Sequence, residues 1–207
     1  NIFLRMLKKS RILENALLAI AKGSRIIAVT GSNTRDFLIS RGINKRNIEI
    51  LSSVVDTNRF YPVSMEKKYD VITMAELIPS KRIDMFLEII SRLKKAGLNL
   101  KAVILGEGPL RLSLQDLAKR LDLEDNVYFA GFHPNVEEYL NRSRIFLMPT
   151  ESEGLSLAML EAMACGVVPV VSDVGDLSDA IDDGANGVLV AKDDMDGFYS
   201  AVRNLLK

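Results

Sequence analysis

From residue 70 onward, short apolar runs alternate with longer amphipathic stretches. Strands are predicted at 70–75, 100–105, 127–130, 145–148, 167–171 and 188–190. Several of these runs are apolar at consecutive positions, which is typical of strands that are covered on both faces. Between them, apolar side chains recur at helical spacing over 85–93 and 110–121. This alternation predicts an α/β fold with a doubly wound, Rossmann-like parallel sheet.

The first fifty residues follow a different pattern. They predict, in order, a basic amphipathic helix over about 2–21, a strand at 25–30, a helix at 33–41 and a strand at 48–52. This is little more than one α/β unit, which is too small for an independent domain. The segment after it is polar and contains Pro62, so a linker is expected there. We therefore expect the chain to divide into residues 1–55, a linker at 56–68 and a main domain at 69–207.

The basic helix has two interpretations. In the first it lies on a membrane surface, through Arg5, Lys8, Lys9 and Arg11. In the second, which we favour, it is a surface helix whose packing partner lies outside this chain. The apolar run at 16–21 is too short to cross a bilayer, and Glu14 interrupts any resemblance to a secretory signal. Because the first residue is asparagine, we expect an excerpt or a processed form.

Composition narrows the choice of partners and cofactors. Twenty-seven basic residues balance twenty-seven acidic ones, so there is no general electrostatic reason to expect nucleic acid as a partner. The single cysteine, Cys165, excludes an internal disulfide, fits a reducing cytoplasm and is expected to be buried and inert. With one histidine, His133, nothing resembles a zinc site, and we expect neither a metal nor a cofactor.

The strongest chemical signal is the stretch 149–172, PTESEGLSLAMLEAMACGVVPVVS. A predicted strand ends there, a polar turn follows, and a helix is predicted from about 155 to 165. Ligands of open α/β sheets bind outside the carboxyl ends of strands, where the N-termini of helices point. The backbone amides of Gly154, Leu155 and Ser156 would be free donors for a diphosphate or for sugar hydroxyls. Gly154 also allows close approach of a ligand.

Two carboxylates, Glu153 and Glu161, bracket this segment. Eight helical residues span about 12 Å, which is too far for both groups to act on one bond as an acid/base pair. The spacing suits an extended ligand, with Glu161 accepting ribose hydroxyls and Glu153 meeting a transferred sugar. Taken alone, the two glutamates favour a plainer reading, in which Glu153 stabilises the helix dipole and Glu161 is a solvated helix residue.

The wider segment EGLSLAMLEAMACGVVPVVS closely resembles the donor-site motif of the family 4 retaining glycosyltransferases, which have the two-domain GT-B fold. The resemblance implies that Glu161 binds the nucleotide ribose, and that Glu153 and the amides after it hold the sugar and diphosphate. VILGEGPLR, with Gly106 and Gly108, looks like the family's strand and glycine turn beside the donor cleft. NVYFAGF resembles the segment that packs around the base, which would place Phe132 and His133 at its border. A lone loop histidine is nevertheless more often structural.

AELIPSKRIDMFLEII aligns with a family stretch whose arginine and lysine neutralise the donor diphosphate. Lys81 falls on the lysine position, but Glu76 occupies the arginine position, where a carboxylate would repel the diphosphate. Either Arg82 substitutes from a neighbouring position, or donor binding is weakened or lost. RIIAVTGSNTRDFLISRGI and IEILSSVVDTNRF resemble the end of the family's first domain and its crossover, with Ser53 and Val54 where Asn-Gly is common.

The resemblance therefore implies transfer of a hexose-type sugar from a UDP- or GDP-sugar, with retained anomeric configuration. The acceptor would be a sugar, a lipid-linked molecule or a protein, in polysaccharide or glycolipid biosynthesis. Lys81 and Glu153 are the expected catalytic residues, and no nucleophile is evident. The expected location is the cytoplasm or the cytoplasmic face of a membrane. The alternatives are a non-catalytic nucleotide-sugar or partner-binding module, which Glu76 favours, and a nucleotide-sugar epimerase.

Most of the first domain, which normally supplies the acceptor pocket, would lie outside this chain. We therefore expect the 207-residue chain to be inactive alone. Residues 1–55 would expose apolar surface and promote self-association.

Overall fold

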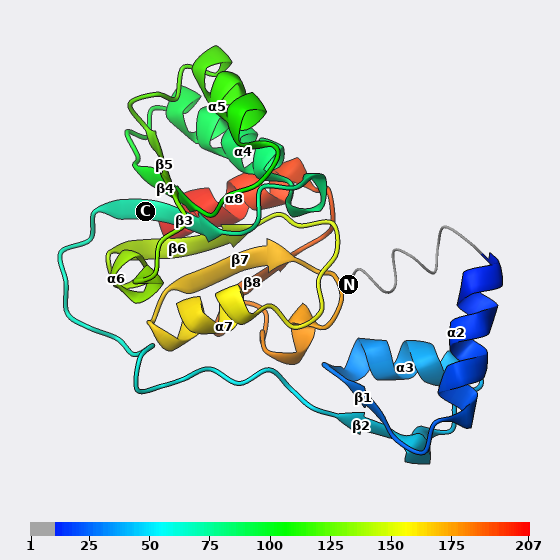
Figure 1. Ribbon diagram of the computed structural model, residues 1–207. Helices are drawn as coiled ribbons and strands as arrows, with labels where there is room; N and C mark the ends of the chain where they lie inside the picture. Colours follow the sequence, from blue (N-terminus) through cyan, green and yellow to red (C-terminus); the bar gives the residue numbers. More distant parts are fainter. Residues whose placement is uncertain (1–10) are drawn as a thin grey trace.

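The computed structural model describes residues 11–207 (Figure 1). The first half of the predicted basic helix lies outside the described residues, and so do Arg5, Lys8 and Lys9 of the proposed membrane contact.

The main part of the chain is built on a six-stranded sheet in which every neighbouring pair is parallel. Its strands are β3 (Tyr69–Met74), β4 (Ala102–Leu105), β5 (Val127–Gly131), β6 (Ser143–Met148), β7 (Val168–Ser172) and β8 (Val188–Val190). The order across the sheet is β5-β4-β3-β6-β7-β8. The predicted fold class is confirmed, and each predicted strand overlaps an observed one.

Helices cover both faces of this sheet (Figure 1). One face carries α4 (Ile83–Lys95), α5 (Arg111–Arg120) and α8 (Met195–Leu205). The other carries α6 (Val136–Asn141) and α7 (Leu157–Ala164). Short 3-10 turns occur at η1 (Lys45–Asn47), η2 (Pro79–Lys81) and η3 (Leu177–Asp179).

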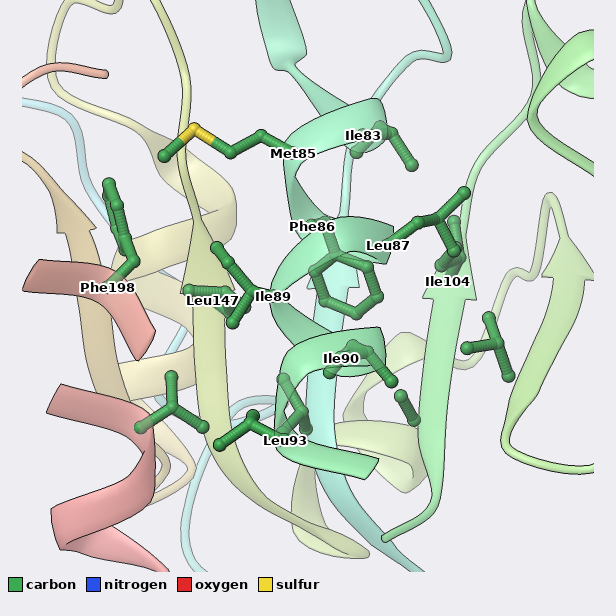
Figure 2. Packing of buried hydrophobic residues seen from close by; sticks show 14 of the residues in the cluster. Ile83, Met85, Phe86, Leu87, Ile89, Ile90, Leu93, Ile104, Leu147 and Phe198 are labelled. Atoms are coloured by element: carbon green, nitrogen blue, oxygen red, sulfur yellow. The ribbon is translucent and has the colours of Figure 1, made fainter. Parts of the chain in front are cut away.

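The larger core lies under α4, whose apolar stripe was evident in the sequence. Phe86 of α4 is fully buried and points toward the sheet, where it lies near Ile104 of β4 (Figure 2). Leu147 of β6 and Phe198 of α8 close the same cluster on its other side. Burial of several large side chains against one helix makes this layer the main source of hydrophobic stabilisation.

Residues 51–68 have no regular secondary structure but are not a free linker. Phe60 is buried in the core on the α7 side of the sheet. Farther along, the Val63 amide donates to Asn141 Oδ1 at 2.7 Å, and Lys67 Nζ donates to the Ser143 carbonyl at 2.8 Å. The segment is therefore fastened along one side of the sheet.

The N-terminal segment forms a second, smaller body of structure. It consists of α2 (Arg11–Gly23), β1 (Ile27–Val29), α3 (Ser32–Ser40) and β2 (Ile48–Ile50), and its two strands pair in parallel. A small apolar cluster of Val29, Leu38, Ile43 and Ile48 holds it together.

Two aspartates after β7, Asp176 and Asp179, join this segment to the main sheet, and we call them the aspartate latch. Asp176 is fully buried and accepts hydrogen bonds from Thr30 Oγ1 at 3.0 Å, the Thr34 amide at 2.9 Å and Thr34 Oγ1 at 2.7 Å. Asp179 accepts from the Ser32 amide and hydroxyl. Both carboxylates thus lie at the N-terminus of α3, where the helix dipole favours negative charge.

Among residues 11–207, no helix is long and apolar enough to cross a bilayer.

The core under α4 leads to a prediction about stability. Replacing Phe86 by alanine should lower the free energy of unfolding by about 3–5 kcal/mol, because it removes a fully buried ring and leaves a cavity. Phe132→Ala is the matched control, since its ring is 79% exposed and the change should cost less than about 0.5 kcal/mol. Urea unfolding followed by circular dichroism measures both. Equal losses in the two variants would contradict this account of the core.

Candidate functional site

The candidate site lies where the sheet changes winding direction, between β3 and β6. From β3 the chain passes through α4 to β4 on one side, and from β6 it passes through α7 to β7 on the other. The loops that leave these adjacent strands therefore diverge to opposite faces of the sheet. A crevice at the carboxyl ends of parallel strands results, and such a crevice is the general ligand position in open α/β sheets.

Lys81 and Glu153 meet across this point. Lys81 follows β3, Glu153 follows β6, and their side chains form an ion pair that is mostly shielded from solvent. The two loops are also joined through the carbonyl of Ser80, which accepts from Thr150 Oγ1 at 2.9 Å and from the Glu151 amide at 2.8 Å. The structure thus brings together the two residues that the sequence suggested for catalysis.

A cleft of about 400 Å³ lies at the ends of β3, β4 and β5, and neither Lys81 nor Glu153 lines it. We call it the β3–β5 cleft. Its lining includes Glu76, Gly106, Phe132, Ala158 and Glu161. Glu161 is on α7, and Phe132 follows β5 with its ring exposed at the edge of the cleft. Four of the residues suggested for nucleotide contact therefore share one cavity: Gly106, Phe132, His133 and Glu161.

Glu161 is partly buried, and this burial raises the pKa of its carboxyl group. The positive charge of Arg59 opposes the shift, and the negative charge of Glu137 adds to it. Arg59 is held close by Glu137, with Nη2 to Oε2 at 2.7 Å. A carboxylate in a partly dehydrated position binds hydroxyl groups well but costs folding free energy while it is ionised.

The glycines of the turn after β4 are required by backbone packing. Gly106 has φ of +128°, and a Cβ there would overlap the carbonyl oxygen of Ala75. A Cβ on Gly108 would lie 2.6 Å from the Leu77 amide nitrogen. Both glycines allow the loops after β3 and β4 to touch, and of the two only Gly106 lines the β3–β5 cleft.

The turn before α7 holds Gly154, Leu155 and Ser156. The helix begins at Leu157, two residues later than predicted, and Ser156 is its N-cap, with Oγ accepting from the Met159 amide at 3.4 Å. The carbonyl of Leu155 accepts from Ser53 Oγ at 3.3 Å. A Cβ on Gly154 would lie 3.2 Å from Thr30 Oγ1, so this glycine also makes room for the N-terminal segment.

Arg82 does not join Lys81 in the crevice. Its backbone is left-handed, with φ of 50°, and its guanidinium is bound to Asp84 in the first turn of α4 and to Asp193 after β8. Arg82, which the sequence suggested as a substitute for the arginine missing at position 76, is thus already paired with two carboxylates. Glu76 is exposed and lines the β3–β5 cleft. The cleft therefore carries a carboxylate at the position where the family pattern has an arginine.

His133 has structural contacts. Its Nδ1 accepts from the Asn135 amide at 3.2 Å, and its ring packs edge-on against Tyr139 at a centroid distance of 4.7 Å. Cys165 is buried, and this burial raises the pKa of its thiol to about 11. These contacts agree with a structural role for His133, and the burial agrees with an inert thiol at Cys165. Within the described part of the chain, no group of three or more acidic, histidine or cysteine side chains is arranged to hold a metal ion.

Sequence reasoning missed a second cleft, which Glu153 lines. It has a volume of about 480 Å³ and lies at the ends of β6, β7 and β8, where α3 of the N-terminal segment forms its opposite wall. We call it the β6–β8 cleft. Its α3 wall is more than a hundred positions away in the sequence from its other lining residues, so no local motif marks it. The one available signal was that polar residues follow β7 and β8, at Asp173 and Lys192.

Comparison with known proteins gives a family match and distant relatives. The family model for glycosyl transferases group 1 matches residues 54–207. The chain is 26% identical over 193 residues to a phosphatidylinositol N-acetylglucosaminyltransferase component of Arabidopsis thaliana, covering 91% of this chain and 43% of that protein. It is 28% identical over 215 residues to a GDP-mannose-dependent alpha-(1-6)-phosphatidylinositol monomannoside mannosyltransferase of Mycolicibacterium smegmatis, covering 94% and 56%. The chain thus spans about half the length of these relatives.

Solved structures share the fold. TarM of S. aureus superposes with a TM-score of 0.84 at 22% identity, over 93% of this chain and 39% of that one. HepE of Anabaena, in a complex with UDP, superposes with a TM-score of 0.83 at 15% identity, over 91% and 56%.

The raised pKa of Glu161 leads to a prediction about stability and pH. Because its folded-state pKa lies above the unfolded value, the ionised carboxylate disfavours the folded state at neutral pH. Glu161→Gln should therefore raise the free energy of unfolding at pH 7, and the gain should shrink as the pH falls toward 4, where the carboxyl becomes protonated. Glu88→Gln, on the exposed side of α4, should change little at either pH. Denaturant unfolding at both pH values tests this, and a gain that grows on acidification would contradict the assigned cause.

Proposed function

Because this chain belongs to the glycosyl transferases group 1 family, we propose that it is the donor-binding part of an enzyme that transfers a sugar from a nucleoside-diphosphate sugar to an acceptor. The observation that carries this proposal is the meeting of Lys81 and Glu153 at the switch point, with Glu161 in the adjoining cleft. The family assignment alone does not say which side chains act, and this arrangement supports Lys81, Glu153 and Glu161 as the candidates.

The donor would lie along the carboxyl edge of the sheet. The base borders Phe132, and Glu161 accepts the ribose hydroxyls in the β3–β5 cleft. The diphosphate lies over Lys81 and the amides of 154–156, and the transferred sugar lies against Glu153. A diphosphate carries more negative charge than one carboxylate, so it competes with Glu153 for the ammonium group of Lys81 and leaves that carboxylate to accept sugar hydroxyls.

In the transfer step, the bond between the anomeric carbon and the diphosphate oxygen breaks, and its electron pair leaves with the nucleoside diphosphate. The acceptor oxygen forms the new bond to the anomeric carbon, and its proton passes to the leaving diphosphate. Lys81 and the turn amides stabilise the negative charge that develops on the leaving group. No side chain of this chain is assigned as a nucleophile. We propose retention of anomeric configuration, which proton NMR of the product decides.

The relatives support the substrate classes that we propose. One is named for GDP-mannose, and the HepE structure holds UDP, which supports a UDP- or GDP-sugar as the donor here. Two are named for transfer to phosphatidylinositol or its mannoside, which supports a lipid-linked acceptor and a role in glycolipid synthesis. We place the reaction at the cytoplasmic face of a membrane. Transfer needs a facing domain, so we expect none from this chain alone.

A second candidate function is a non-catalytic nucleotide-sugar-binding module. Glu76 favours it, because a carboxylate at this position cannot neutralise the negative charge that develops on a leaving diphosphate and so opposes turnover. Turnover assays on a full-length protein that contains this chain separate the two functions. Binding of the donor without transfer or hydrolysis would support the module.

The donor site is tested by titration of the chain with UDP in a calorimeter. Glu161→Ala should weaken UDP binding by about tenfold or more, because it removes hydrogen bonds between a charged carboxylate and the ribose. Glu88→Ala, which removes an exposed glutamate from α4, should leave the affinity unchanged. Absence of UDP binding, or an affinity that is insensitive to Glu161→Ala, would refute the site.

The departure at Glu76 gives a second, independent prediction. Glu76→Arg should strengthen UDP binding by about tenfold, because it removes a repulsive charge from the β3–β5 cleft and adds a cation for the diphosphate. Glu88→Arg produces the same change in net charge far from the cleft and controls for long-range attraction. Calorimetric titrations at equal ionic strength measure both, and weaker binding by Glu76→Arg would place the diphosphate elsewhere.

A further inference from the structure

Arg59 contacts parts of the molecule that border the donor site, although it lines neither cleft. It lies in the segment 51–68, next to the buried ring of Phe60. Its guanidinium donates to Glu137 Oε2, from Nε at 3.0 Å and from Nη2 at 2.7 Å. Nη2 also donates to the Pro134 carbonyl. Any effect of Arg59 on a ligand in the β3–β5 cleft is therefore indirect.

The position of Arg59 is fixed by its own neighbours. The amides of Arg59 and Phe60 both donate to the Asp56 carbonyl, at 3.1 and 2.9 Å. The central guanidinium carbon lies 4.9 Å from the centre of the Phe60 ring, within the range of cation–π attraction. Because Phe60 is anchored in the core on the α7 side of the sheet, the charge of Arg59 is held at the surface of the main domain.

Arg59 fastens the loop that forms the base end of the β3–β5 cleft. Three residues of this loop and of the start of α6 line the cleft: Phe132, His133 and Val136. Arg59 binds Pro134, within this stretch, and Glu137, which follows it in the first turn of α6. The wall beside the expected base is thus bonded to the segment 51–68 at two positions.

The same guanidinium acts on Glu161. Burial raises the pKa of the Glu161 carboxyl, the charge of Arg59 lowers it, and the charge of Glu137 raises it. The other ionisable groups around this carboxyl line the same cleft or follow on α7: Glu76, Glu107, His133 and Cys165. None of these four is a fixed positive charge. Arg59 therefore supplies the attraction that favours the ionised carboxylate.

Two other cations at this edge of the sheet are engaged elsewhere. Lys81 forms the ion pair with Glu153 and does not line the β3–β5 cleft. Arg111 pairs with Glu107, which does line it. Both charges already have a carboxylate partner, so neither takes the place of the guanidinium from the segment 51–68.

We propose that Arg59 is a positioning residue of the donor site, which acts on the ribose through Glu161 and on the base through the loop that it binds. This inference rests on the proposed function, because it needs a nucleotide in the β3–β5 cleft. The positive charge keeps the carboxylate in the form that accepts two ribose hydroxyls, and the hydrogen bonds hold the wall beside the base. A residue of the segment 51–68 thus sets the donor affinity of the main domain without touching the donor.

The first test needs no nucleotide. Carbon-13 NMR follows the Glu161 carboxyl as the pH is varied, and Glu161→Gln identifies its signal. Arg59→Gln should move the midpoint to higher pH, because it removes an attraction for the ionised form, while Arg59→Lys should stay near the wild type. Glu137→Gln should move the midpoint to lower pH, because it removes a repulsion. A merely structural role predicts the same direction for both glutamine variants, since both break one ion pair. Shifts in the same direction, or none, would overturn the proposal.

The second test is calorimetric titration with UDP at pH 6 and pH 8. Arg59→Gln should weaken binding by about threefold at pH 6. The loss should be smaller at pH 8, where the Glu161 carboxyl is ionised with or without the arginine, and Arg59→Lys should recover most of it at pH 6. In a Glu161→Gln background, Arg59→Gln should have the same effect at both pH values, because the titrating partner is gone. A pH-dependent effect that persists in that background would overturn the proposal.

Arg92 offers a matched control. It also combines an ion pair, to Asp196 at 2.7 Å, with an aromatic ring, of Tyr199 at 4.7 Å, but it belongs to α4 on the other face of the sheet. The side chains of Arg59 and Arg92 are 44% and 41% exposed, so the two glutamine variants should have similar melting temperatures. Arg92→Gln should leave the Glu161 midpoint and the UDP affinity unchanged. Equal effects of the two variants on UDP binding would overturn the proposal.

The two measurements separate this proposal from the function on which it rests. If Glu161→Ala weakens UDP binding but Arg59→Gln changes neither the midpoint nor the affinity, the donor site stands and the role of Arg59 is wrong. If Arg59→Gln shifts the midpoint but the wild-type chain does not bind UDP, the proposed function fails and the donor role of Arg59 fails with it.

Discussion

Two adjacent parallel strands, β3 and β6, send the chain to opposite faces of the sheet, and the position of every candidate functional residue depends on this divergence. If both loops covered the same face, the turn with Lys81 and the turn with Glu153 would compete for one space. Because they separate, a crevice remains between them, and each turn contributes one charge to it. Packing requirements on the two faces of the sheet thus determine where charged groups can meet.

Such a site needs rigid support, because charged groups that are partly removed from water weaken the fold. The layer under α4 provides it on one side, through fully buried rings such as Phe86 and Phe198. Between the two turns, the Ser80 carbonyl accepts from Thr150 and from the amide of Glu151, which fixes their spacing. Glu161 is then held in a partly buried position that raises its pKa, and the well-packed core compensates for that cost.

Patterns that depend on neighbouring residues could be read from the sequence, and those that depend on distant contacts could not. Consecutive apolar residues predicted the buried strands, and helical spacing predicted α4, because local burial imposes both patterns. The resemblance also placed Lys81 and Glu153 in one site. By contrast, α6 was missed because six residues give too short a periodic pattern. The binding of Arg82 by Asp193, 111 residues away, has no local signature, and neither do the burial of Phe60 and the aspartate latch.

The latch also bears on the turn that carries Glu153. Gly175, beside the latch, has φ of +62°, and a Cβ there would overlap the Glu153 carbonyl oxygen. Next to it, the Asp176 amide donates to the Gly154 carbonyl at 3.3 Å, while the Asp176 carboxylate holds Thr30 and Thr34. One loop is thus bonded both to the N-terminal segment and to the backbone of the turn between the two clefts. Closely packed contacts transmit displacement, so a shift of α3 relative to the sheet would strain the backbone of the turn that holds Glu153.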